Sequence, residues 1–133
     1  SWRWTMRVIA SCAVAFLMLM LSHPLTAFAQ DDRCPTGFSN DACDQWRFER
    51  ADKMLSELVV SEISDLGKWS TDRLWQEEAK KLLLEAHSAW QAFRAAECKA
   101  RSTINVISAR TRAGKLSACL LALTQQRIAQ IKS

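Results

Sequence analysis

The chain has 133 residues, with 18 Lys and Arg against 14 Asp and Glu, so its formal net charge is only +4. It holds two histidines and no tyrosine, which leaves few groups for acid–base catalysis and argues against an enzyme. A chain of this length fits one small domain.

The first 29 residues have the pattern of a secretory signal peptide. Arg3 and Arg7 come before or at the start of an apolar run from Val8 to Leu21, and Ala27-Phe28-Ala29 is a small-residue cleavage site. The run is shorter than the roughly 20 residues that a membrane-spanning helix needs. We therefore expect an exported protein, periplasmic or secreted, in which residues 30–133 form one domain.

Cys12 follows Ile9-Ala10-Ser11, which looks like the box that precedes a lipidated cysteine. Such a box follows its hydrophobic region, whereas most of this apolar run comes after Cys12. The order favours an ordinary signal peptide that contains a cysteine.

Four cysteines remain after residue 29, and an even number in an exported chain indicates two disulfides. They are Cys34, Cys43, Cys98 and Cys119. Four cysteines permit three pairings. We favour Cys98 with Cys119 and Cys34 with Cys43, because the first pair would lie at matched height across a helical hairpin.

The apolar spacing predicts three helices after an irregular lead-in over residues 30–40. The first helix starts with Asn40 or Asp41 as N-cap and ends at Gly67. The second follows the start signal Ser70-Thr71-Asp72 and reaches at least Cys98. Its apolar face includes Leu74, Trp75 and Trp90.

Residues 102–107 are polar and β-branched, so we expect a break there. The third helix follows Gly114. No segment alternates with the period of a strand. The predicted fold is all-α, a small antiparallel three-helix bundle stabilised by two disulfides.

Residues with obvious chemistry are scarce. His87 has no His or Cys four residues away, so a metal site has little support, and a half-buried or solvated histidine is the simpler interpretation. No haem, phosphate-binding or nucleophile motif is present. We predict no catalytic residue, cofactor or metal.

Charge is distributed unevenly along the chain. Residues 30–98 hold 14 acidic and nine basic side chains, whereas residues 99–133 hold seven basic and no acidic ones. Arg110, Arg112 and Lys115 are therefore candidate contacts for an anionic surface. The alternative is that these cations pair with the acidic helices of the same bundle. Trp69, beside the predicted turn at Gly67, is a further candidate contact.

Two segments, residues 84–98 and 119–127, carry a recognisable pattern. It has a Trp, an aromatic-Arg pair and a Cys on one helix, then Cys, Leu-Thr and Arg on the next. The matching residues are Trp90, Phe93, Arg94, Glu97, Cys98, Cys119, Leu123, Thr124 and Arg127. Weaker matches are Cys34, Cys43, Ala51, Asp52 and Leu55. In these residues the chain resembles the LprI-type lysozyme inhibitor family.

The chain also departs from the family pattern. His87 stands where Gln is usual, Phe93 where Tyr is frequent and Ser56 where Asn is common, and the Gly-rich stretch before the last cysteine is nearly absent. The matched residues are typical of a scaffold: Trp90 and Phe93 pack, and Arg94 bridges to a carboxylate or a helix end.

The resemblance implies a protein that inhibits a lysozyme, so the expected partner is a muramidase. The predicted export argues against a nucleic acid as partner. The acidic first and second helices would then face a basic lysozyme. The alternative is an envelope accessory protein that docks on anionic lipid or cell-wall polymer through its basic C-terminal section.

Overall fold

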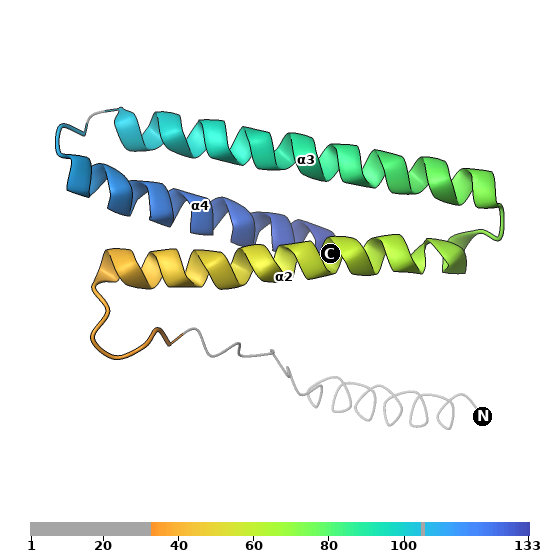
Figure 1. The fold of residues 1–133 in the computed structure, drawn as a ribbon, viewed down its shortest axis with the longest axis horizontal. Coiled ribbons are helices and arrows are strands. Elements are labelled where there is room, and N and C mark those ends of the chain that lie inside the picture. The colour runs from red at the N-terminus through yellow and green to blue at the C-terminus, as the bar shows by residue number, and fades with distance from the viewer. Residues whose placement is uncertain (1–32, 105) are drawn as a thin grey trace, which may run out of the picture. The chain divides into compact units, whose positions relative to one another are not determined.

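The structure is a computed structural model that describes residues 33–104 and 106–133. The predicted signal peptide (1–29), Cys12 included, lies outside the described residues. The described part forms three helices, α2 (Asn40–Trp69), α3 (Arg73–Thr103) and α4 (Ala109–Lys132), and contains no strand. α3 runs antiparallel to α2 and α4 (Figure 1). The predicted all-α, antiparallel three-helix bundle is confirmed.

The N-cap of α2 lies one residue before Asn40 and two before Asp41, the two predicted caps. Ser39 is the N-cap, and its Oγ accepts a hydrogen bond from the amide of Ala42 at 3.3 Å. The lead-in turns at Gly37, whose φ of +92° lies in the left-handed region that favours glycine. Gly67 does not end the helix, because α2 continues to Trp69 and stops at the extended Ser70.

α3 starts where the sequence indicates. The Oδ1 atom of Asp72 accepts hydrogen bonds from the amides of Leu74 and Trp75, at 2.9 and 3.3 Å. The helix ends at Thr103, inside the polar, β-branched run. There the hydroxyls of Ser102 and Thr103 both donate to the carbonyl of Lys99, a competition with the helical backbone that is typical of these residues.

α4 begins at Ala109, five residues before the predicted start at Gly114. Gly114 lies inside the helix and is buried, because α2 approaches it closely. A Cβ at this position would lie 2.5 Å from Oδ1 of Asp41. Gly114 therefore permits a close contact between α4 and the first turn of α2.

Both disulfides have the favoured pairing, Cys34 with Cys43 and Cys98 with Cys119. The first fixes the lead-in to α2, and the second joins the last turns of α3 to α4. Both lie in the half of the bundle that contains the α3–α4 connection.

The core is small and unusually polar. Among the described residues, the buried apolar side chains are Cys43, Leu55, Val59 and Cys98, and the buried polar ones are Arg94, Ser102, Ser117 and Thr124. In α2 none lies beyond Val59, and in α3 none lies before Arg94. The core is thus confined to the disulfide half and the middle of the bundle.

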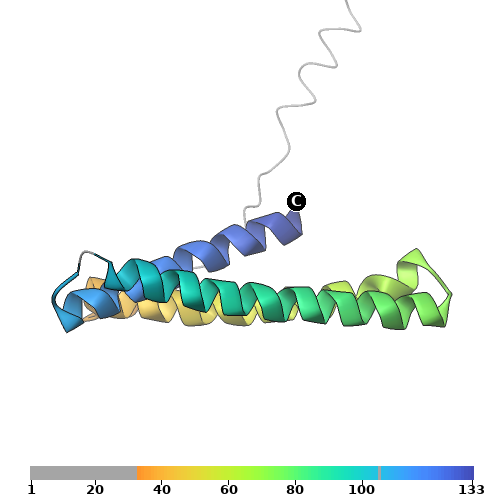
Figure 2. The same ribbon diagram turned by 90° about the horizontal axis from the view of Figure 1, so that it is seen from above.

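The other half is a two-helix hairpin. α4 has 24 residues against 30 and 31 for α2 and α3, and its Lys132 Nζ reaches only the level of Met54, 3.9 Å from that sulfur. α4 also leans away from the hairpin toward its C-terminus (Figure 2). The α2–α3 turn therefore projects beyond the three-helix part (Figure 1). None of the described helices is long and apolar enough to cross a membrane.

Candidate functional site

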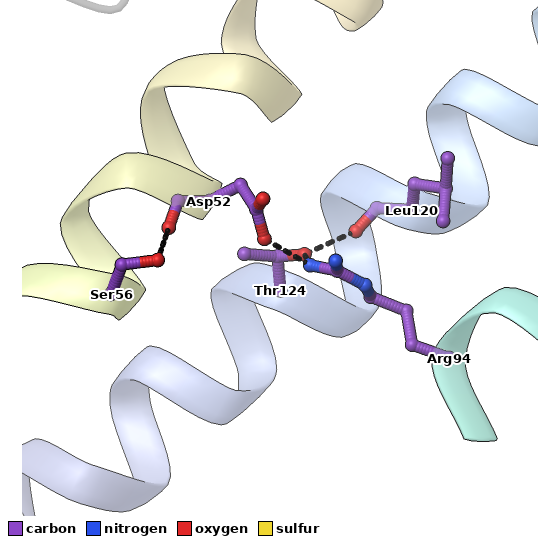
Figure 3. Close-up of polar contacts among 5 residues, drawn as sticks. All are labelled: Asp52, Ser56, Arg94, Leu120 and Thr124. Atoms are coloured by element: carbon purple, nitrogen blue, oxygen red, sulfur yellow. Dashed lines mark hydrogen bonds and ion pairs between the residues drawn. The ribbon is translucent and has the colours of Figure 1, made fainter. Parts of the chain in front are cut away.

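A polar bridge joins the three helices at the middle of the bundle (Figure 3). Arg94 of α3 donates from Nη1 to Oδ1 of Asp52 on α2 at 2.5 Å and to Oγ1 of Thr124 on α4 at 2.8 Å. Thr124 donates in turn to the carbonyl of Leu120 at 2.7 Å. The Arg94 side chain is only 9% exposed, so its charge depends on these partners.

Aromatic rings enclose the same guanidinium. The Cζ atom of Arg94 lies 5.1 Å from the ring centre of Phe48 and 4.9 Å from that of Trp90. Arg127 of α4 faces Trp90 as well, at 6.0 Å. These distances are those of cation–π contacts, so Trp90 connects two cations from different helices.

His87 lies one turn before Trp90 and belongs to the same cluster. The two rings are stacked, with centroids 6.4 Å apart. Burial lowers the pKa of His87 below its usual 6.5; Asp52 opposes the shift, and Arg127 and Arg94 add to it. The imidazole is therefore neutral at neutral pH.

The residues that match the family pattern have two different environments. Trp90, Arg94 and Thr124 meet in the bridge, and Arg127 joins them through Trp90. Phe93 is 54% exposed, so it does not pack as expected, and Glu97 forms an ion pair with Arg101 one turn later on α3. Because most of the matched residues bind each other, the pattern describes a scaffold more than a surface.

The α2–α3 turn carries the first exposed surface of interest. Trp69 is 81% exposed, as expected for a contact residue, and Leu74 is 83% exposed. Trp75 is 43% exposed. Leu74 and Trp75 belong to the predicted apolar face of this helix, yet that face is uncovered here because α4 stops short of them. Trp69, Leu74 and Trp75 are called the hairpin tip below.

The opposite end of the bundle carries the second surface. The last turns of α3 and the first turns of α4 hold five exposed cations, here called the basic end: Lys99, Arg101, Arg110, Arg112 and Lys115. Between them, Ile104 is 60% and Ile107 98% exposed. Arg112 Nη2 donates to the carbonyl of Ile107 at 3.4 Å, so cation and isoleucine are neighbours.

The cations of α4 do not neutralise the acidic helices by ion pairing. Within residues 33–104 and 106–133, no ion pair joins a cation of α4 to a carboxylate of α2 or α3. A shallow hollow does bring Arg110 and Lys115 near Asp41 and Asp44, yet Asp44 pairs with Arg47 at 3.9 Å. Of the basic section, Arg101 pairs with Glu97 of α3, as the alternative of pairing within the bundle expects, whereas the described cations of α4 form no such ion pair.

Two features of the structure were not predicted from the sequence. Asp52 and Arg94 match the family pattern separately, but only the fold makes them partners 42 residues apart. Ile104 and Ile107 lie in the run that predicted a helix break, and their exposure was not predicted. Their place in a polar connection between two helices was the available signal.

Among the described residues, no group of three or more His, Cys, Asp and Glu side chains is placed to hold a metal ion. The described residues define a class of protein. It is a small helical bundle with two disulfides, a polar bridge at its centre and an exposed surface at each end. Two disulfides fit an extracytoplasmic compartment.

The model of the family described as lysozyme inhibitor LprI matches residues 32–131. The chain belongs to this family, whose members are described as inhibitors. Searches of curated proteins and of solved structures found no match.

Proposed function

We propose that this protein is an exported, non-enzymatic inhibitor that binds a lysozyme-type muramidase, and that the hairpin tip makes the contact. Membership of the LprI family over residues 32–131 is the observation that carries the proposal. In this proposal residues 1–29 are a signal peptide, and residues 30–133 are the domain that acts in the periplasm or outside the cell.

The shape and chemistry of the hairpin tip support its role. Trp69 and Leu74 expose more than four fifths of their surface at a turn of only three residues between two helices. Enzyme clefts are concave and largely apolar, so a projecting apolar turn fits them better than a flat helix face does. Tryptophan is also among the residues that contribute most to binding at protein interfaces.

Charge supports the same end of the molecule. Residues 57–85, the outer half of the hairpin, hold seven acidic and four basic side chains, a net charge of −3. Animal-type lysozymes are basic, so this half attracts them, whereas the basic end repels them. Attraction between exposed charges is screened by salt, so binding should weaken as ionic strength rises.

The test is hydrolysis of bacterial cell walls by a panel of lysozymes with and without the oxidised protein. We expect inhibition by the native protein and at least a tenfold weaker inhibition by Trp69→Ala, in line with the loss of an interface anchor. Ile107→Ala is the control, because Ile107 is an apolar side chain that is even more exposed than Trp69 but lies at the opposite end.

Three results would count against parts of this proposal. Failure to inhibit any lysozyme would contradict the muramidase target. Equal inhibition by Trp69→Ala and the native protein would contradict the tip as the contact. An inhibition constant that does not change with salt would contradict the electrostatic attraction. Far-UV circular dichroism of each variant shows whether it is folded.

A further inference from the structure

We propose that the basic end binds the surface of an anionic phospholipid leaflet, with Ile104 and Ile107 inserted among the lipids. The proposal does not rest on lysozyme inhibition, because it uses the other end of the molecule. Lipid is the proposed partner because exposed isoleucines lie between the cations.

The basic end has a net positive charge that its own surroundings do not remove. Residues 97–115 hold five cations and one carboxylate, Glu97, which is paired with Arg101. The adjoining start of the bundle, residues 33–47, adds two cations and two carboxylates and no net charge. Among the described residues, this end therefore keeps a charge of +4. The first turn of α4, which belongs to this end, contains no acidic residue. The positive end of the helix dipole therefore adds to the positive potential.

Exposed isoleucines distinguish lipid from other anionic partners. Ile107 is 98% exposed and Ile104 60% exposed, on a connection that no other part of the described chain covers. A polyanionic sugar or phosphate polymer attracts cations but offers no apolar interior for these side chains. A phospholipid leaflet offers both, since cations bind the headgroups and apolar side chains enter the headgroup–acyl boundary.

The basic end and the hairpin tip lie at opposite ends of the bundle, so binding of lipid at one end leaves the other end accessible. α3 has 31 residues and joins the basic end to the hairpin tip, so the two are separated by about 45 Å at 1.5 Å per residue. A protein bound through its basic end would hold the hairpin tip far from the headgroups. Binding of a lipid surface and of a protein at the tip would not compete for the same residues.

The experiment is cosedimentation of the full, oxidised protein with vesicles at low and high salt. One set contains phosphatidylcholine alone, and the other contains phosphatidylcholine mixed with phosphatidylglycerol. We expect binding to the anionic vesicles only. The triple variant Arg110→Gln, Arg112→Gln, Lys115→Gln should bind on the order of 100-fold less, because each basic residue near such a surface contributes about fivefold.

A charge-matched control separates a local site from net charge. The variant Lys53→Gln, Lys80→Gln, Lys81→Gln removes three exposed lysines from the other parts of α2 and α3 and should bind like the native protein. The pair Ile104→Asn, Ile107→Asn should bind about tenfold less, as expected for lost apolar burial. Val60→Asn, at a valine 66% exposed in α2, is its control.

Each other outcome overturns the proposal. Equal loss in the two triple variants would mean that net charge alone drives binding. Full binding by the isoleucine pair would mean that no side chain inserts, and that any anionic polymer would serve. Equal binding to neutral vesicles, or none to either set, would exclude the anionic leaflet. The lysozyme assay with the uncharged isoleucine pair tests the proposed function separately, because Ile104 and Ile107 lie at the end opposite the hairpin tip.

Discussion

Removing Asp52 should destabilise the protein more than removing Arg94, although the two residues form one ion pair. In Asp52→Ala, the Arg94 guanidinium stays in place with its side chain only 9% exposed, and Thr124 is its one remaining partner of the bridge. Removal of one member of a buried pair costs about 3–5 kcal/mol. The Asp52 side chain is 34% exposed, so water can reach the site, and we expect about 2–3 kcal/mol.

Arg94→Met should cost less, at about 1 kcal/mol, because it removes the charge and keeps most of the volume. Thr124 keeps its hydrogen bond to Leu120, and the carboxylate of Asp52 is exposed enough to be hydrated. The double variant Asp52→Ala, Arg94→Met should be close to Arg94→Met alone, because the stranded charge is gone. In a domain of this size the loss in Asp52→Ala corresponds to a fall in Tm of roughly 10–20 °C.

Urea unfolding of the oxidised protein, followed by circular dichroism at the helix band, measures these free energies. Glu57→Ala is the control, because Glu57 is a carboxylate of the same helix that is 68% exposed and paired with Lys53 at 3.9 Å. That pair should contribute less than about 0.5 kcal/mol. The reasoning is refuted if Asp52→Ala equals Glu57→Ala, or if Arg94→Met is the less stable of the two bridge variants.

Two further predictions concern His87 and the disulfides. Because the pKa of folded His87 lies below its usual 6.5, the unfolded chain binds a proton first, so the free energy of unfolding should fall as pH drops below about 6.5. His87→Gln should lack this part of the pH dependence; an identical slope between pH 7.5 and 5.5 in both proteins would contradict the assignment. Loss of Cys98–Cys119 should cost about 3.4 kcal/mol and loss of Cys34–Cys43 about 2.7 kcal/mol, since they close loops of different length. Double Cys→Ala variants test this in urea, and the reverse order would show that loop entropy does not determine their contributions.

The helices themselves were predictable because their signals are local. The period of the apolar residues, the cap at Asp72 and the polar, β-branched run near residue 103 act within one or two turns. The family pattern likewise indicated the scaffold, and the matched height of Cys98 and Cys119 across the predicted hairpin favoured the disulfide pairing that the structure has. Cap positions failed where a neighbour competed: Ser39 replaced Asn40, and α2 continued through Gly67.

Tertiary structure alone decided which side chains are covered. Leu74 and Trp75 follow the helical period as well as any core residue, yet both are exposed because α4 ends before it reaches them. Gly114 has the sequence character of a helix boundary, yet it lies inside α4 where Asp41 packs against it. The pairing of Asp52 with Arg94 also depends on how the helices meet. Periodicity shows which face of a helix is apolar, but burial of that face depends on the length and position of another helix.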